Sequence, residues 1–158
     1  EYCFIKIFKG MKNIDYTTGD LISPWADVKM DVHDIPFEEN SFDVVICNHV
    51  LEHVDDSNKV MREFYRVMRP GGWGIFQVPI DNNNPNTIED KSVTDPKERE
   101  RLYWQSDHLR LFGRDYGDRL SKAGFKVTES DYINELDPKL VERYALPKNE
   151  KVYFCEKI

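Results

Sequence analysis

The chain has 158 residues, of which 40% are hydrophobic and 32% charged, a composition typical of a globular protein with one domain. A formal net charge of −7 argues against nucleic acid as a partner, because phosphate binding favours a basic surface. No apolar run reaches the roughly 18 residues that a membrane span needs, so no membrane partner is expected. The cysteines Cys3, Cys47 and Cys155 are widely separated, which favours a reduced, cytoplasmic protein over a disulfide framework.

The first third of the chain predicts one short helix and two short strands. Apolar residues spaced by three and four predict a helix over residues 2–9 that ends at Gly10, with a strand as the alternative. Residues 13–18 are partly β-branched or aromatic, and they predict a strand that leads into Asp20. A second short strand is expected within residues 26–32.

The middle of the chain predicts a buried strand, an amphipathic helix and another strand. Residues 42–47 form a nearly continuous apolar run, which is typical of a parallel strand buried on both faces. Asp55 or Asp56 can cap the helix that follows, and the sequence Pro-Gly-Gly at 70–72 is expected to end it. Residues 73–78 predict the next strand.

The last half of the chain begins with a long polar segment. Residues 81–100 are too long for an ordinary connection, so we expect a lid or binding loop over about 81–114. Two helices and two strands complete the pattern, at residues 96–103, 115–123, 125–129 and 152–155. Alternating strands and helices predict an α/β sheet, which binds ligands beyond the carboxyl ends of its strands.

Acidic residues follow two of the predicted strands. Asp20 is placed to accept hydrogen bonds from two ribose hydroxyls, with Asp15 as the competing acid and a simple turn role as the alternative. Asp31 and Val32 follow the next strand, where a carboxylate and a backbone N–H can bind the edge of an adenine. A cap or loop role is the alternative for Asp31.

Histidines suggest two further kinds of site. His49 and His53 are four residues apart and flank Glu52, but the pattern is not His-Glu-x-x-His and no further ligand is at the usual spacing, so we expect no metal. His108 beside Asp107 is a weak candidate for a general base, since imidazole titrates near neutrality. The alternative is a structural histidine that is hydrogen-bonded to the backbone.

Three segments together resemble the type 11 family of class I S-adenosylmethionine-dependent methyltransferases. They are Asp-Val-His-Asp-Ile-Pro-Phe-Glu-Glu-Asn-Ser-Phe-Asp-Val-Val-Ile-Cys at 31–47, Leu-Glu-His-Val at 51–54 and Glu-Phe-Tyr-Arg-Val-Met-Arg-Pro-Gly-Gly at 63–72. Ala-Gly-Phe at 123–125 is similar to the family's C-terminal region. The resemblance implies a Rossmann-like sheet, mostly parallel with an antiparallel C-terminal strand, that transfers a methyl group to an acceptor, here expected to be a small molecule.

The resemblance also assigns roles by position. Asp20 corresponds to the ribose-binding acid, Asp31 and Val32 to the adenine-contacting pair, and Asn48 and His49 to residues that flank the methionine moiety of S-adenosylmethionine. Such a reaction needs positioning and exclusion of water more than it needs a catalytic motif. A nucleotide-binding oxidoreductase is the weaker reading, because Gly-x-Gly-x-x-Gly is absent from the sequence.

One part of the family pattern has no counterpart here, namely the first strand and its glycine-rich loop. Residues 2–10 resemble the helix after that loop, and Glu1 resembles the last residue of the motif. We therefore expect residues 1–158 to be a single, partial, N-terminally truncated domain. The gap predicts unpaired sheet edges that close on each other or join two chains into a homo-oligomer, and it leaves a cofactor-deficient fragment as the alternative function.

Overall fold

The N-terminal region forms one helix and a small parallel sheet. The computed structural model describes residues 2–147 and 149–158, so the expectation for Glu1 lies outside the described residues. Helix α1 spans Tyr2–Lys9, which confirms the predicted helix. Strands β1 (Gly19–Asp20) and β2 (Val28–Lys29) pair in parallel. The ring of Phe8 lies 5.3 Å from that of Tyr16, so α1 packs on the loop that leads to this pair.

The predicted strand at 13–18 is wrong, because that segment is a loop and only the two residues after it pair. Side chains replace the expected strand ladder: the backbone N–H and hydroxyl of Thr18 both donate to Asp27, at 3.0 and 2.7 Å. Lys9 donates to the other oxygen of Asp27 at 2.6 Å. The loop is therefore fastened to α1 and to the start of β2 by one carboxylate.

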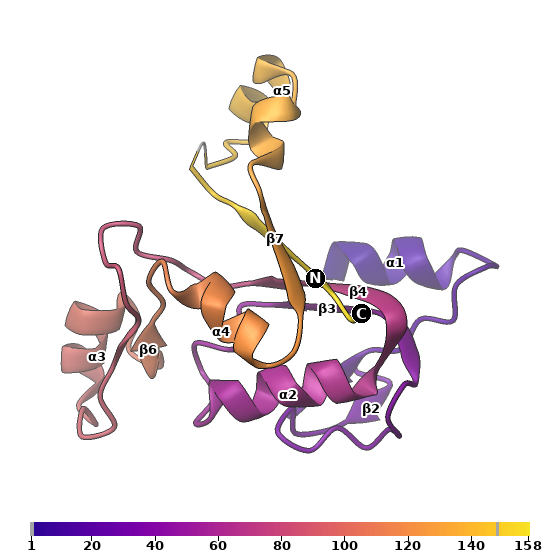
Figure 1. The fold of residues 1–158 in the computed structure, drawn as a ribbon, viewed down its shortest axis with the longest axis horizontal. Helices are drawn as coiled ribbons and strands as arrows, with labels where there is room; N and C mark the ends of the chain where they lie inside the picture. Colours follow the sequence, from indigo (N-terminus) through magenta and orange to yellow (C-terminus); the bar gives the residue numbers. More distant parts are fainter. Residues whose placement is uncertain (1, 148) are drawn as a thin grey trace.

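A four-stranded sheet forms the centre of the molecule, as Figure 1 shows. Its strands are β3 (Phe42–Asn48), β4 (Met68–Gln77), β7 (Lys126–Ser130) and β8 (Val152–Glu156), in the order β3-β4-β8-β7. Strands β3 and β4 are parallel, whereas β8 is antiparallel to both β4 and β7. This mixed sheet confirms the predicted α/β class and its antiparallel C-terminal strand.

Helices α2 (Ser57–Val67) and α4 (Tyr116–Lys122) pack on one face of the sheet. Asp56 caps α2 by accepting a hydrogen bond from the N–H of Lys59 at 2.9 Å. The ring of Phe76 on β4 lies 5.0 Å from that of Phe64 on α2. The buried core lies at this junction and is made by Val60, Met61, Phe64, Val67, Phe76, Tyr116, Leu120, Phe125, Tyr153 and Cys155, among others.

The other face of the sheet is partly open, and here the prediction that residues 42–47 are buried on both faces is wrong. Asp43 and Val44 are exposed, and Cys47 is the buried residue of β3. Because β3 lies at the edge of the four-stranded sheet, one of its sides has no neighbouring strand among the described residues. One of its faces is also partly exposed. Trp73 and Phe154 stack on this face with ring centroids 5.4 Å apart.

The turn between α2 and β4 also differs from the prediction. The helix ends at Val67, before the Pro-Gly-Gly sequence, and β4 already begins at Met68. Gly71 adopts φ 79°, a left-handed conformation that glycine reaches at little cost. Its N–H donates to the carbonyl of Lys157 at 2.7 Å, so the glycine turn fastens the C-terminal end of the chain to the sheet.

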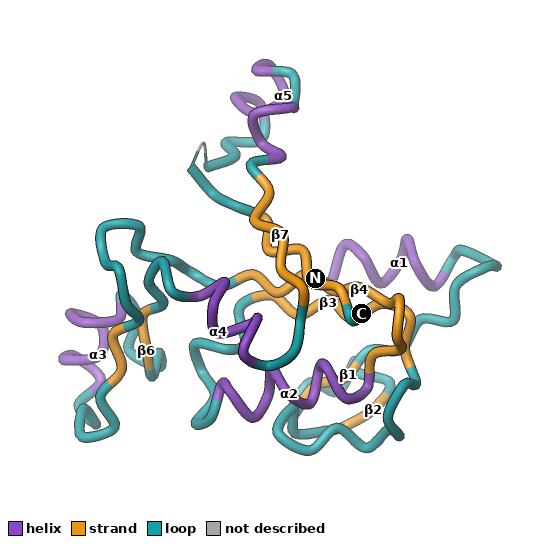
Figure 2. The backbone as a smooth tube through the Cα atoms, in the orientation of Figure 1, coloured by secondary structure: helices purple, strands orange, loops and turns teal. Residues whose placement is uncertain are grey.

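The predicted lid forms a separate group of elements at one side of the sheet, seen at the left of Figure 1. Helix α3 (Pro96–Tyr103) confirms the expected helix, and β5 (Ile88–Glu89) pairs antiparallel with β6 (Arg110–Leu111). Both strands have two residues, too short to give a pattern in the sequence. Helix α5 (Pro138–Arg143) follows a 3-10 turn at Tyr132–Glu135 and projects beyond β7, as Figure 2 shows.

Candidate functional site

Asp20 lies at the carboxyl end of β1, where its side chain shapes the following turn. Its Oδ1 accepts hydrogen bonds from the N–H groups of Ile22 and Ser23, at 2.8 and 2.7 Å. These two bonds lower the pKa of Asp20 below its usual value, against a small opposing effect of burial. Oδ1 of Asp20 therefore has the turn role that was the alternative. The carboxylate is exposed and ionised, so it can still accept hydrogen bonds from further donors.

Asp31 follows β2 and is joined to the start of α2 through a histidine. Its Oδ1 accepts from the N–H of His33 at 2.9 Å and lies 2.7 Å from His33 Nδ1. Both bonds lower the pKa of Asp31. His33 Nε2 accepts from the N–H of Asp56 at 3.3 Å, so the segment after β2 lies beside the segment after β3. Val32 packs against the core.

Two residues of α2 hold the loop over 31–37 in place, and the sequence analysis missed them. Glu63 accepts from the N–H of Ile35 at 3.0 Å. Arg66 donates to the carbonyls of Ile35 and Phe37 at 2.8 and 2.7 Å, and its guanidinium pairs with Glu63. Their spacing of three on the polar helix face was visible, but the partner loop could not be read from that spacing.

Asn48 and His49 stand at the carboxyl end of β3. Asn48 is in register with Gln77 on β4, and the N–H of His49 donates to the Gln77 carbonyl at 2.8 Å. His49 has φ 56°, so the chain turns sharply there and leaves 61% of the imidazole exposed. Its Nδ1 lies 3.3 Å from Glu52 Oε1. The strand end thus presents an exposed imidazole beside the buried side chain of Glu52.

A hollow of about 370 Å³ lies beyond the carboxyl ends of β3 and β4. His49 and Trp104 both line it, and both have left-handed backbones, with φ 56° and 72°. Such conformations cost energy in residues other than glycine and are frequent at functional sites. The remaining lining comes from the segment after β4, the lid, the segment before β8 and β8 itself: Val78, Pro79, Ile80, Asn82, Pro147, Asn149, Glu150, Lys151 and Tyr153.

The buried Arg110 of β6 ties the lid to the segment after β3. Its Nη1 donates to the carbonyls of Leu51 and Val54, each at 2.6 Å, and its Nη2 donates to the carbonyl of Asp55 at 3.2 Å. The same Nη2 pairs with Glu89 of β5 at 2.9 Å. One guanidinium therefore satisfies three backbone carbonyls that would otherwise be desolvated without a partner.

His108, the weak candidate for a general base, is 5% exposed. Its Nδ1 lies 2.8 Å from the carbonyl of Tyr103, which only accepts, so this nitrogen carries the proton. The ring packs edge-on against His53 at 4.7 Å. The alternative of a histidine bonded to the backbone describes this geometry, and the catalytic role stays a prediction.

The candidate cofactor residues fall into two groups. Pairing of β1 with β2 brings Asp20 and Asp31 to one edge, while Asn48 and His49 follow β3 in the other sheet. The hydrogen bond from the Asp56 N–H to His33 links the two groups. The hollow at the end of β3 is lined by His49 but not by Asp20 or Asp31.

Residues 11–76 match the model of a family described as a methyltransferase domain. A sterol 24-C-methyltransferase from Schizosaccharomyces pombe is 30% identical over 125 residues, covering 75% of this chain and 31% of that protein. A ubiquinone biosynthesis O-methyltransferase from Bordetella avium is 36% identical over 69 residues, 40% of this chain and 28% of that protein.

Residues 11–76 therefore carry the methyltransferase domain of this family, and the two relatives are themselves methyltransferases. The chain therefore spans only about a third or less of the length of the sterol and ubiquinone methyltransferases that it matches. Among solved structures, the Burkholderia thailandensis 1,6-didemethyltoxoflavin-N1-methyltransferase with S-adenosylhomocysteine is similar, with a TM-score of 0.57 at 15% identity. The superposition covers 88% of this chain and 59% of the Burkholderia protein. The [4+2]-cyclase SpnF shares the fold, with a TM-score of 0.52 at 15% identity over 81% of this chain and 55% of that chain.

The residues of this methyltransferase domain suit the cofactor that the family implies. The ionised carboxylate of Asp20 at the end of β1 can accept hydrogen bonds from ribose hydroxyls. The side chains of Leu21 and Ile22 next to it are exposed and provide apolar surface. Asp31 keeps its carboxylate more than half exposed, at 55%, next to the half-buried Val32.

Within the described residues, no helix combines the length and apolar character that crossing a membrane requires.

Proposed function

We propose that this protein is an S-adenosylmethionine-dependent methyltransferase that methylates a small molecule. The observation that carries the proposal is the placement of all five sequence-predicted residues at carboxyl ends of parallel strands, within a chain whose residues 11–76 match the methyltransferase domain. In open α/β sheets, that edge is where ligands bind.

The cofactor side of the site is assigned to the loops after β1, β2 and β3. Asp20 accepts hydrogen bonds from the ribose hydroxyls, and Asp31 and Val32 contact the adenine. Asn48 and His49 flank the methionine end of the cofactor. Glu63 and Arg66 keep the 31–37 loop on α2, which fixes the adenine-binding backbone before the ligand arrives. S-adenosylmethionine supplies an already activated methyl group, so the chain's residues serve to bind, orient and exclude water.

The acceptor side is assigned to the hollow lined by His49 and Trp104. Its volume of about 370 Å³ falls in the range of small-molecule sites. Apolar residues just after β4 and the charged residues Glu150 and Lys151 give it both packing surface and polar contacts. His49 lines the hollow at the end of β3, and its exposed imidazole is the candidate general base where the acceptor must lose a proton.

Calorimetry with S-adenosylhomocysteine tests the proposal on the full chain. We expect saturable one-to-one binding that weakens at least about tenfold in Asp20→Asn, because an amide replaces the charged acceptor of two hydroxyls. Asp118→Asn, an exposed acid on α4, is the matched control and should leave the affinity unchanged. Absence of binding by the unmodified chain would favour the cofactor-deficient alternative, and equal affinities in both variants would remove Asp20 from the site.

A further inference from the structure

A compact cluster of two histidines and one glutamate lies between the segment after β3 and the lid. Glu52, His53 and His108 each offer one ligand atom, and these atoms lie within 4.8 Å of one another. The sequence analysis rejected a metal because the local pattern supplied too few ligands. His108 comes from a distant part of the chain, and the fold supplies it as the third ligand.

The carboxylate of Glu52 has no partner for one of its oxygens. Glu52 is 1% exposed, and its Oε2 is buried without a hydrogen bond among the described residues. At its Oε1, the Nδ1 of His49 approaches to 3.3 Å. A buried carboxylate oxygen without a donor is costly, and a bound cation is one of the few ways to compensate it.

Both histidines are oriented as metal ligands usually are. His108 donates its Nδ1–H to the carbonyl of Tyr103 at 2.8 Å, and His53 Nδ1 lies 3.3 Å from the carboxylate of Asp107. The hydrogen bond of His108 leaves the lone pair on its Nε2, and the contact with Asp107 favours the same tautomer in His53. Ligating histidines typically donate their other N–H to a carbonyl or carboxylate, which fixes the tautomer and raises the basicity of the ligand.

Hydrogen bonds to backbone carbonyls hold the cluster together without help from the cluster's own side chains. The N–H of Leu109 donates to the carbonyl of Glu52 at 2.8 Å. Next along the chain, Arg110 donates to the carbonyls of Leu51 and Val54. The 51–55 turn and the 108–110 segment are therefore fixed beside each other, and the three ligands converge from a preformed frame.

We propose that Glu52, His53 and His108 bind a divalent transition-metal ion such as Zn²⁺. Two imidazole nitrogens and one carboxylate oxygen form a common three-ligand set for this ion and leave a coordination position open. Ligands of one tetrahedral ion lie about 3.3 Å apart, so the cluster contracts by side-chain rotation when the ion binds. The ion joins the lid to the end of β3, next to the hollow that His49 lines.

Zn²⁺ titration of the untagged chain, followed through the ring-nitrogen NMR signals of its histidines, tests the site independently of S-adenosylmethionine. We expect one-to-one binding with shifts at Nε2 of His53 and His108, and no shift at His33. The unmodified chain carries this readout, so it does not depend on a variant that folds.

Variants then assign the ligands by calorimetry with Zn²⁺ alone. Glu52→Gln and His108→Gln should each weaken binding by more than about 100-fold, and Asp107→Asn by about 10-fold as an outer partner. His33→Gln is the matched control and should bind as the unmodified chain does. No saturable binding, shifts centred on His33, or equal affinity in Glu52→Gln and the unmodified chain would each overturn the site.

Discussion

The guanidinium of Arg110 is buried, and among the described residues its two terminal nitrogens bond one carboxylate and three backbone carbonyls, while its Nε has no hydrogen-bond partner. Glu89 offers one carboxylate oxygen, while the carbonyls of Leu51, Val54 and Asp55 take the other hydrogen bonds. A lysine could not satisfy this arrangement, because it lacks the planar fork of donors. The turn that carries the end of the β3 site therefore depends on one side chain of the lid.

Replacing Arg110 with methionine keeps the volume and removes the donors. We expect the free energy of unfolding to fall by about 3 to 5 kcal/mol, since three carbonyls and Glu89 lose their buried partner. Urea denaturation measures it. Arg101→Met, at an exposed helix residue paired with Glu98, is the control and should change little. Equal midpoints for the two variants would show that the carbonyls find other donors.

Helix α2 acts on the site through its polar face. Its apolar face packs on the sheet, whereas Glu63 and Arg66 hold the 31–37 loop. The hydrogen bond from Arg66 lowers the pKa of Glu63 below its usual value of 4.5, against the opposing effect of burial and with help from the Ile35 N–H. The element therefore links core packing to the geometry of the loop that carries Asp31.

Glu63→Gln should reduce stability by about 1 to 3 kcal/mol near neutral pH, the usual worth of a hydrogen bond to a charged group. Because the folded-state pKa is lowered, this contribution is present above about pH 4.5 and disappears as the pH falls through the folded-state value. Stability measured from pH 7 down to pH 3 should therefore decline less steeply in the variant. Parallel declines would show that the charge of Glu63 is not involved.

Asp115 connects the lid to α4. Its Oδ1 accepts from the N–H and the hydroxyl of Thr87, both at 2.7 Å, and its Oδ2 accepts from Arg119 at 3.0 Å. Burial alone would raise the pKa of Asp115, but these hydrogen bonds lower it. The carboxylate therefore stays ionised and holds the start of the lid to the helix.

In Asp115→Asn we expect faster amide hydrogen exchange over residues 84–93, about tenfold or more, because one hydrogen bond to a charged group is worth more than about 1.4 kcal/mol. Exchange in α2 should not change. Asp95→Asn, at the cap of α3, serves as a control within the lid. Unchanged exchange at Thr87 in the Asp115 variant would show that other contacts hold the lid.

The sequence predicted elements with a clear apolar pattern, namely α2, β3 and β8, together with the capped helix α3, although β3 is less buried than expected. It failed where pairing is very short, as in β5 and β6, or where a side chain replaces the ladder, as Asp27 does before β1. The five candidate cofactor residues, whose roles stay a prediction, lie at or shortly after the carboxyl ends of β1, β2 and β3. Glu63, Arg110 and the His53–His108 pair were missed because their partners lie far along the chain.

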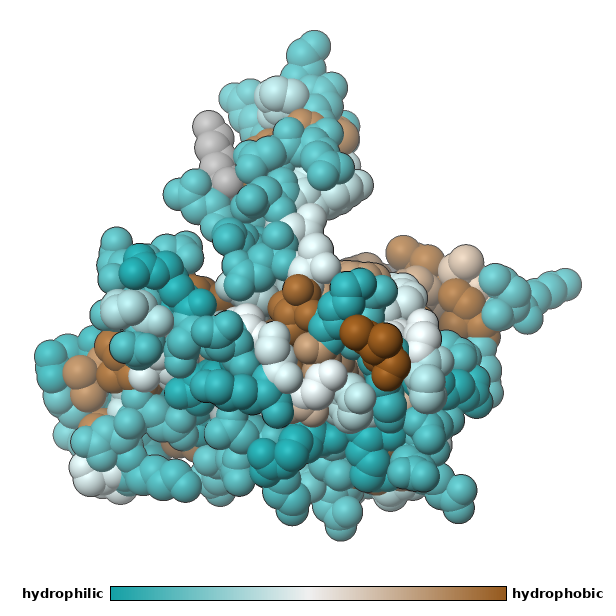
Figure 3. Space-filling view, in the orientation of Figure 1, coloured by the Kyte–Doolittle hydropathy of each residue, from teal (hydrophilic) through white to brown (hydrophobic). Residues whose placement is uncertain are grey.

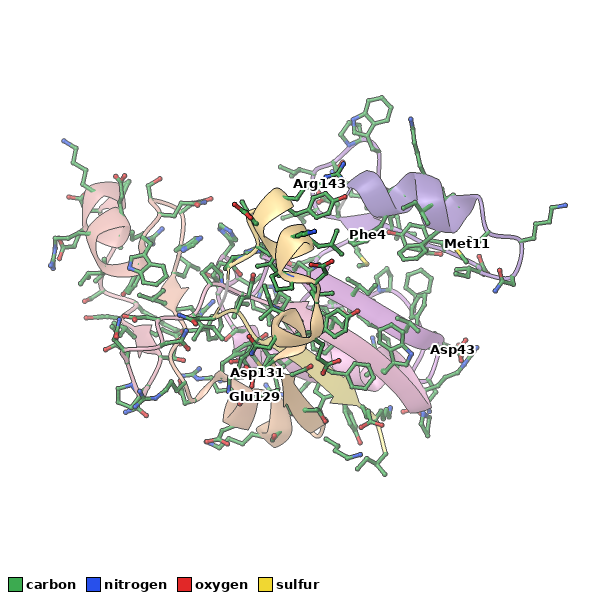
Figure 4. All side chains as sticks on the ribbon, turned by 90° about the horizontal axis from the view of Figure 1, so that it is seen from above. Phe4, Met11, Asp43, Glu129, Asp131 and Arg143 are labelled. Carbon is green, nitrogen blue, oxygen red and sulfur yellow. The ribbon has the colours of Figure 1, made fainter. Side chains whose placement is uncertain are left out.

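At the scale of the whole molecule, the sheet edge formed by β3 is open. The edge of β3 away from β4 pairs with no strand among the described residues, and Val44 on it is 38% exposed. Figure 4 shows Phe4 and Met11 on the side of α1 toward the strands, and both remain more than a third exposed. Apolar surface also covers α1 in Figure 3. Open edges beside apolar surface favour association between chains.

We therefore predict concentration-dependent self-association, measured by sedimentation velocity. Val44→Lys should reduce it, because a lysine on an edge strand opposes strand pairing. Leu140→Lys on α5, similarly exposed at 41%, is the control and should leave association unchanged. A monodisperse monomer that binds S-adenosylhomocysteine with micromolar affinity would contradict the prediction.

The central claim is that the carboxyl ends of β1, β2 and β3 together form the cofactor site of a methyltransferase. Backbone amide chemical shifts on addition of S-adenosylhomocysteine test it most directly, without a variant. We predict saturable shifts that include Asp20, Asp31, Val32, Asn48 and His49 and that spare the projecting helix α5. Shifts confined to the lid or to α5, or no shifts at millimolar ligand, would contradict the claim.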